Sequence, residues 1–109
     1  MRTLRFIVDG QTITQDPFCD FSGLTPGTEG YLQAEFIFSP EWAGTRRVAS
    51  FFSNLGNEYK PQVIKNDCRC LIPAEALSKS IFKVQVIGRI GSQKLCTNKV
   101  IVHQKGVKA

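Results

Sequence analysis

The sequence predicts an all-β protein, an antiparallel two-sheet immunoglobulin-like (Ig-like) β-sandwich of about seven or eight strands. Residues 31–38, YLQAEFIF, alternate apolar and polar side chains with a period of two, which is typical of a strand with one buried face. Short segments of this kind recur between clusters of Gly, Pro, Asn, Asp and Ser. Phenylalanine is frequent, with 8 residues, and aromatic side chains favour sheets.

The N-terminal third is predicted to hold three strands and one long loop. Residues 4–8 alternate as a first strand, and the turn dipeptide Asp9-Gly10 lets residues 11–14 pair back as a hairpin. Residues 15–30 are rich in Asp, Pro, Gly, Ser and Thr, so we expect a long loop there. Loops of this length in compact domains are often functional. The alternating strand at residues 31–38 follows the loop.

Further strands are predicted between the remaining turn signals, at residues 46–53, 58–65, 68–72, 81–89 and 94–103. Pro61 cannot donate a backbone hydrogen bond, so its strand is expected at a sheet edge. Pro73 predicts a single helical turn over residues 73–77. On the longest strand, Phe82, Val84 and Val86 alternate and are expected on one face. A small barrel is the alternative way to close these strands.

The 109 residues form one predicted domain with a basic tail at residues 104–109. No run of about 18 apolar residues is present, so no membrane span is expected. The N-terminus, MRTLRFIVDG, lacks the apolar segment and the small-residue cleavage site of a signal peptide. We therefore expect synthesis in a cytoplasm and no membrane partner.

Charge is distributed unevenly along the chain. Residues 1–44 contain two basic and six acidic residues, whereas residues 45–109 contain twelve basic and three acidic residues. Such asymmetry fits nucleic-acid binding, head-to-tail packing of copies, or an acidic protein partner. Alternatively, a fold that interleaves the two halves would cancel it.

The four cysteines, Cys19, Cys68, Cys70 and Cys96, are expected to be free thiols because the chain shows no export signal. Zinc sites usually need paired C-x-x-C spacing or more histidines than the single His103. We therefore expect no metal site and no cofactor.

No catalytic residues are predicted. The chain has no G-x-S-x-G elbow, no G-x-G-x-x-G loop and no Walker motif. Its one histidine, His103, lies near the C-terminus and would have to serve any nucleophile–histidine–acid triad. We expect a protein that is not an enzyme.

Two aromatic positions have alternative interpretations. Phe51 and Phe52 must point to opposite faces of a strand, so one ring, taken to be Phe52, is either a partner contact or lies under a loop. Trp42 either caps the core, with its N–H bonded to the backbone, or anchors a partner. Arg46 and Arg47 lie beside these rings, and arginines next to aromatic rings are the components of a nucleic-acid stacking groove. The aromatic residues occupy core-like positions, however, so nucleic-acid binding is not expected.

The predicted partner-binding residues come from the loop and strand after residue 41 and from the basic tail. They are Trp42, Arg46, Arg47, Phe52, Lys105 and Lys108.

Three segments resemble a known family. They are FIFSPEWAGTRRVASFF at residues 36–52, CLIPAEAL at residues 70–77 and VQVIG at residues 84–88. The pattern F-S-x-x-W-x-G, followed by an aromatic strand and C-x-I-P-x-x-x-L, is similar to that of the baseplate upper protein N-terminal domain family, small Ig-like structural proteins of tailed phages. The resemblance covers roughly residues 31–103.

The resemblance implies an attachment or decoration module of a virion, at the baseplate, the neck or the capsid. It implies synthesis in the host cytoplasm, phage structural proteins as partners, and a homo-oligomer as a further option. Those relatives continue into a long C-terminal region, whereas this sequence ends at Ala109. We therefore expect a stand-alone module.

Other non-enzymatic functions remain as alternatives. A small phage-encoded inhibitor of a host or defence protein would suit the small size and the basic C-terminal half. A carbohydrate-binding module would need an exposed aromatic platform, so a buried Trp42 would argue against it.

Overall fold

The computed structural model describes residues 1–105. Nine strands lie in this range, together with two 3-10 turns, η1 at Pro40–Trp42 and η2 at Ala76–Ser78. The strands are β1 (Arg2–Asp9), β2 (Thr12–Gln15), β3 (Leu32–Phe38), β4 (Arg46–Ser53), β5 (Gln62–Val63), β6 (Arg69–Leu71), β7 (Ile81–Ile90), β8 (Gln93–Cys96) and β9 (Val100–His103).

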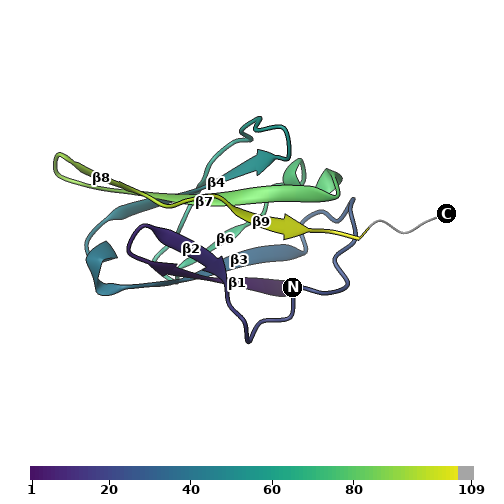
Figure 1. Ribbon diagram of the computed structural model, residues 1–109, viewed down its shortest axis with the longest axis horizontal. Helices are drawn as coiled ribbons and strands as arrows, with labels where there is room; N and C mark the ends of the chain where they lie inside the picture. Colours follow the sequence, from purple (N-terminus) through teal and green to yellow (C-terminus); the bar gives the residue numbers. More distant parts are fainter. Residues whose placement is uncertain (106–109) are drawn as a thin grey trace.

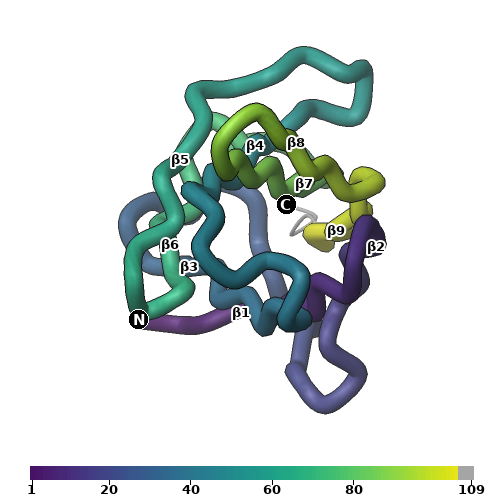
Figure 2. Tube along the Cα trace, turned by 90° about the vertical axis from the view of Figure 1, so that its left-hand side faces the viewer, coloured from purple at the N-terminus to yellow at the C-terminus, as the bar shows by residue number. Residues whose placement is uncertain are grey.

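The strands form two sheets that pack face to face (Figure 1). Sheet A has the order β2-β1-β3-β6, and sheet B has the order β5-β4-β7-β8 with β9 also paired to β7. Viewed from the end, β5 lies beside β6 on one side of the sandwich and β9 lies beside β2 on the other (Figure 2). The predicted all-β, two-sheet sandwich is confirmed. Within residues 1–105, no helix is long and apolar enough to cross a membrane.

One pair of strands departs from the predicted antiparallel arrangement. β1 and β3 run parallel, from the pair Arg2↔Leu32 to the pair Val8↔Phe38. β2 turns back along one edge of β1, and residues 16–31 then carry the chain to the other edge. Because β3 starts at the end of the sheet where β2 finishes, it enters antiparallel to β2 and therefore parallel to β1.

Two predicted strands are shortened or divided. The segment 58–65 contributes only the two-residue β5, because the register with β4 shifts by one residue between the bridge Phe52↔Glu58 and the pair Ala49↔Gln62. β5 lies at a sheet edge, as predicted. The segment 94–103 divides into β8 and β9. Between them Asn98 turns to β2, where its side-chain Oδ1 accepts from the Ile13 N–H at 2.8 Å and its Nδ2 donates to the Ile13 carbonyl at 3.3 Å. Asn98 thereby joins the edge of sheet A to sheet B.

The core between the sheets is built from the alternating apolar side chains. Phe6 and Phe36 are register partners and stack with their ring centroids 5.6 Å apart. Phe82, Val84 and Val86 are fully buried on β7, which confirms their predicted common face.

Trp42 lies on η1, where the chain crosses from sheet A to sheet B, and it is fully buried. Its indole N–H donates to the Gly10 carbonyl in the β1–β2 turn at 2.8 Å. The ring lies on Gly88 of β7, where an added Cβ would be 2.6 Å from Trp42 Cζ3. The core-capping interpretation is confirmed, and the prediction that Trp42 binds a partner is wrong because no part of its side chain is accessible.

The predicted long loop, observed at residues 16–31, packs against the rest of the protein. Leu24 is buried, and the ring of Phe21 contacts Phe6 edge-on at 5.5 Å. The Gly27 N–H donates to the Leu77 carbonyl beside η2 at 2.8 Å. The loop is therefore part of the packed structure and holds the start of β3 in place.

Gly88→Ala should destabilise the protein by about 1–3 kcal/mol, because the new methyl group has to displace a buried, hydrogen-bonded indole. Urea denaturation of the variant and of wild type measures the difference. Ser92→Ala, at an exposed position of the same hairpin, is the control and should change stability by less than about 0.5 kcal/mol. Wild-type stability of Gly88→Ala would contradict the packing described for Trp42.

Candidate functional site

The uneven distribution of charge along the sequence becomes, in the fold, a difference in charge between sheet A and sheet B. The acidic N-terminal part supplies β1, β2 and β3 of sheet A, whereas every strand of sheet B begins at residue 46 or later. Only β6 crosses from the basic part of the chain into sheet A. In Figure 1 the purple and dark blue strands form the lower layer, and the bright green and yellow strands lie in the upper layer. The fold therefore keeps the two halves largely apart instead of interleaving them.

The charged side chains on the outer face of sheet A neutralise one another. Arg5 Nε lies 2.8 Å from Glu35 Oε1, and Arg69 Nη2 lies 3.1 Å from Glu35 Oε2. On the other side, Arg5 Nη1 lies 3.6 Å from Asp16 Oδ2. The hydrogen bond from Arg5 is the main cause that lowers the pKa of Glu35 below its ordinary value, against the opposing effect of partial burial; the hydrogen bond from Arg69 adds to it. These four groups therefore form a paired row across the sheet.

The outer face of sheet B carries five cationic side chains and is called here the basic face. Its cations are Arg46, Lys83, Arg89, Lys94 and Lys99. Those on β4 and β7 alternate with the buried residues Phe51 and Val84, so they point away from the core. None of the five forms a salt bridge within the described part of the chain, where all three salt bridges belong to sheet A.

Two of the predicted partner-binding residues remain exposed. Arg46 is exposed on the basic face, next to η1. Lys105 is exposed beyond β9, and its backbone N–H donates to the Leu24 carbonyl at 2.9 Å. Lys108 lies outside the described residues.

Arg47 and Phe52, two other predicted partner-binding residues, have contacts within the fold. Arg47 lies on the core side of β4, with its guanidinium carbon 4.1 Å from the centroid of Phe38 and its Nη2 2.6 Å from the Trp42 carbonyl. Phe52 points outward but is only 6% exposed, because Lys99 of the β8–β9 connection lies over its ring at 4.0 Å. The alternative that a loop covers the Phe52 ring is confirmed, so this ring is not an exposed partner contact. Arg47 is partly exposed, and its contact with a partner stays a prediction.

Sequence reasoning missed four of the five cations of the basic face. Lys83 and Arg89 alternate with the predicted core residues of β7, so the strand period was a signal for their outward direction. Their meeting with Arg46 and Lys94 depends on the register of β4, β7 and β8, which the period does not specify.

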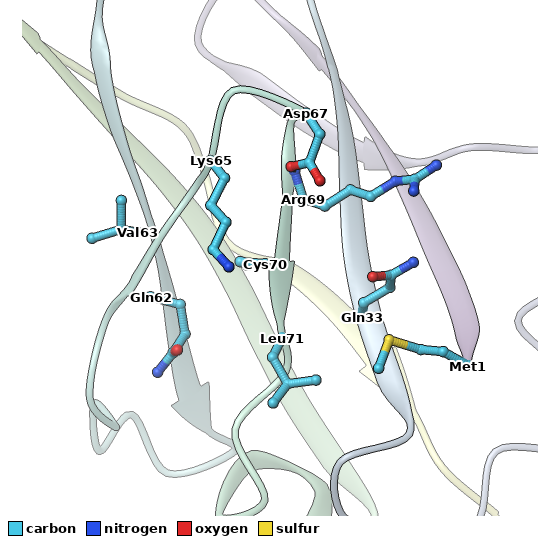
Figure 3. A pocket seen from close by; sticks show the side chains of 9 residues that line it. All are labelled: Met1, Gln33, Gln62, Val63, Lys65, Asp67, Arg69, Cys70 and Leu71. Carbon is cyan, nitrogen blue, oxygen red and sulfur yellow. The ribbon is translucent and has the colours of Figure 1, made fainter.

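A shallow cleft of about 310 Å³ lies between β5 and β6, where the edges of the two sheets meet (Figure 3). Figure 3 shows Arg69 extending over β3, away from Lys65; Glu35 holds its guanidinium there. The Asp67 carboxylate accepts from the Arg69 backbone N–H at 3.1 Å. Lys65 is then the only charged side chain of the lining without a hydrogen bond among the described residues, so the cleft does not bring several ligand-binding side chains together.

The four cysteines are free, and residues 1–105 contain no group of three or more His, Cys, Asp or Glu side chains arranged to hold a metal ion. Cys70 faces the core, and burial raises the pKa of its thiol to about 12. Cys19, Cys68 and Cys96 are each half-buried.

Cys70 should resist alkylation in the folded protein, because its thiol is both inaccessible and protonated at neutral pH. Treatment with iodoacetamide at pH 8, followed by peptide mass spectrometry, should find Cys70 modified more slowly than Cys19, Cys68 and Cys96. In urea all four should react at similar rates, which is the control. Rapid native modification of Cys70 would contradict its placement in the core.

Glu35→Gln should lower the free energy of unfolding at pH 7 by about 0.5–1 kcal/mol, because Arg5 and Arg69 lose their shared carboxylate. The folded pKa of Glu35 is depressed, so its stabilisation is complete above its ordinary value of about 4.5 and is lost as the pH falls through the folded value. The difference between variant and wild type should therefore shrink at pH 3. Glu75→Gln removes an exposed carboxylate that forms no salt bridge with residues 1–105 and is the control. An equal effect of both substitutions would contradict the paired row.

Comparisons of the chain with protein-family models, with curated proteins and with solved structures found no match.

Proposed function

We propose that this protein is a non-enzymatic structural module of a tailed-phage virion, which attaches to another virion protein through the basic face. The observation that carries the proposal is the group of five cations on one sheet with no salt-bridge partner among residues 1–105, beside a second sheet whose charges are paired. The motifs at residues 36–52, 70–77 and 84–88 support the phage assignment.

The architecture suits a module that presents a surface. The two sheets are joined by Trp42 at η1 and by Asn98 between β8 and β9, so the outer face of sheet B is held on a rigid frame. Charge complementarity with an acidic surface would steer docking and fix its orientation. The baseplate, the neck and the capsid surface are the candidate locations, and self-association on the particle is compatible with each.

A second candidate is a small inhibitor of a host or defence protein, which the same five cations would suit if the acidic surface belonged to a host protein. A glycan-binding function is less well supported, because Trp42 is buried and supplies no aromatic platform.

Mass spectrometry of gradient-purified virions, from the phage that encodes this chain, tests the proposal. We expect a fixed number of copies per particle, comparable to that of other virion proteins. A phage replication protein quantified in the same preparation is the control for contamination. Absence from particles together with abundance in infected cells would overturn the virion role and favour the inhibitor.

A further inference from the structure

We infer that the basic face binds an acidic, amphipathic segment of a partner protein, which lies across β4, β7 and β8 with its carboxylates on a row of three cations and its apolar side chains on the neighbouring row. The inference rests on the proposed function in one respect, that the partner is a protein.

The strand register places three cations side by side. Arg46 of β4 is opposite Arg89 of β7, and Arg89 is opposite Lys94 of β8. All three side chains are exposed. Like charges directly opposite each other destabilise a sheet, so this row is unfavourable for folding alone. A ligand that brings carboxylates to it would remove the repulsion.

An apolar row lies next to the cationic row, two residues further along β4. It consists, in strand order, of Val63, Val48, Ile87 and Cys96. Val63 is 72% exposed, and the other three side chains are partly exposed. Two hollows of about 510 and 360 Å³ border Arg46 and Val48, so the surface is indented where the two rows meet. The pairing of a charged row with an apolar row matches an amphipathic ligand.

The dimensions of the two rows set the size of the bound segment. The apolar row crosses four adjacent strands, which are about 4.8 Å apart, so it is about 14 Å long. The cationic row lies about 7 Å from it, because two residues of a strand separate them. About ten residues of a helix, or four to five of an extended chain, would cover this length.

The composition of the face favours a protein segment over nucleic acid. Its one Phe, Tyr or Trp ring among the described residues, Phe52, is covered by Lys99 and is not available for base stacking. An apolar row contributes little to binding a phosphate backbone, which is held mainly by charge. By contrast, an apolar centre beside charged groups is the usual composition of a protein interface.

Photo-crosslinking in the phage tests the inference directly. Benzoylphenylalanine replaces Val63 at one end of the apolar row, and in a control it replaces Ile37, which is exposed on the outer face of sheet A. We expect the probe at Val63 to crosslink to a segment of another protein that is rich in Asp, Glu and apolar residues, and the probe at Ile37 not to reach that segment. Adducts at Val63 with nucleotides or with a second copy of this chain would overturn the inference.

Charge reversal gives an independent readout. The double variant Arg46→Glu, Arg89→Glu should lower the number of copies per virion at least about tenfold. Lys79→Glu reverses one exposed charge beside η2, outside the basic face, and should leave the copy number unchanged. Both variants should melt near the wild-type temperature by circular dichroism, and normal incorporation of the first variant would overturn the inference.

The two proposals can fail separately. If wild-type protein is in virions but Arg46→Glu, Arg89→Glu is incorporated normally, the virion role stands and the inferred segment is wrong. If the protein is absent from virions, the Val63 probe is used in infected cells. A crosslink there to an acidic segment of a host protein would support the inferred segment without the virion role.

Discussion

The packing of Trp42 between the two sheets is the interaction on which the rest of the structure depends. Its indole N–H is bonded to Gly10 of sheet A, while its ring lies on the backbone of Gly88 in sheet B. Arg47 closes this end of the core, since its guanidinium binds the Trp42 carbonyl and lies over Phe38. These contacts fix the crossing from β3 to β4, and Arg46, the residue before Arg47, lies on the opposite face of β4.

A second connection holds the sandwich on the side of β2 and β9. The Asn98 amide makes the pair of hydrogen bonds to Ile13 that a neighbouring strand would otherwise make, and the Asn98 N–H donates to the Gln11 carbonyl at 3.2 Å. This satisfies part of an exposed strand edge, which reduces the risk of edge-to-edge association. The same break in the strand places Lys99 over Phe52. One polar residue thus closes the edge and helps to form the basic face.

The two outer faces differ in how their charged side chains are arranged. On sheet A, cross-strand neighbours have opposite charge, as with Arg5, Glu35 and Arg69, and each gains from its partner. On sheet B, cross-strand neighbours have the same charge, as with Arg46, Arg89 and Lys94. A row of like charges does not stabilise sheet B, which is why the proposed binding role is assigned to it.

The sequence by itself determined most of the strands and the alternating core of this protein, but not the extent of the strands predicted at 58–65 and 94–103. The period of two is a local property, so the buried face of β7 and the full extent of β4 at residues 46–53 could be predicted from neighbouring residues. Only the tertiary structure decided what depends on contacts between distant residues. The parallel pair of β1 and β3, the burial of Trp42 and the cover over Phe52 all belong to this class. The same holds for the basic face. Its charges are visible in the sequence, but the register that places Arg46 beside Arg89 comes from pairing of two residues 43 positions apart, which no local pattern specifies.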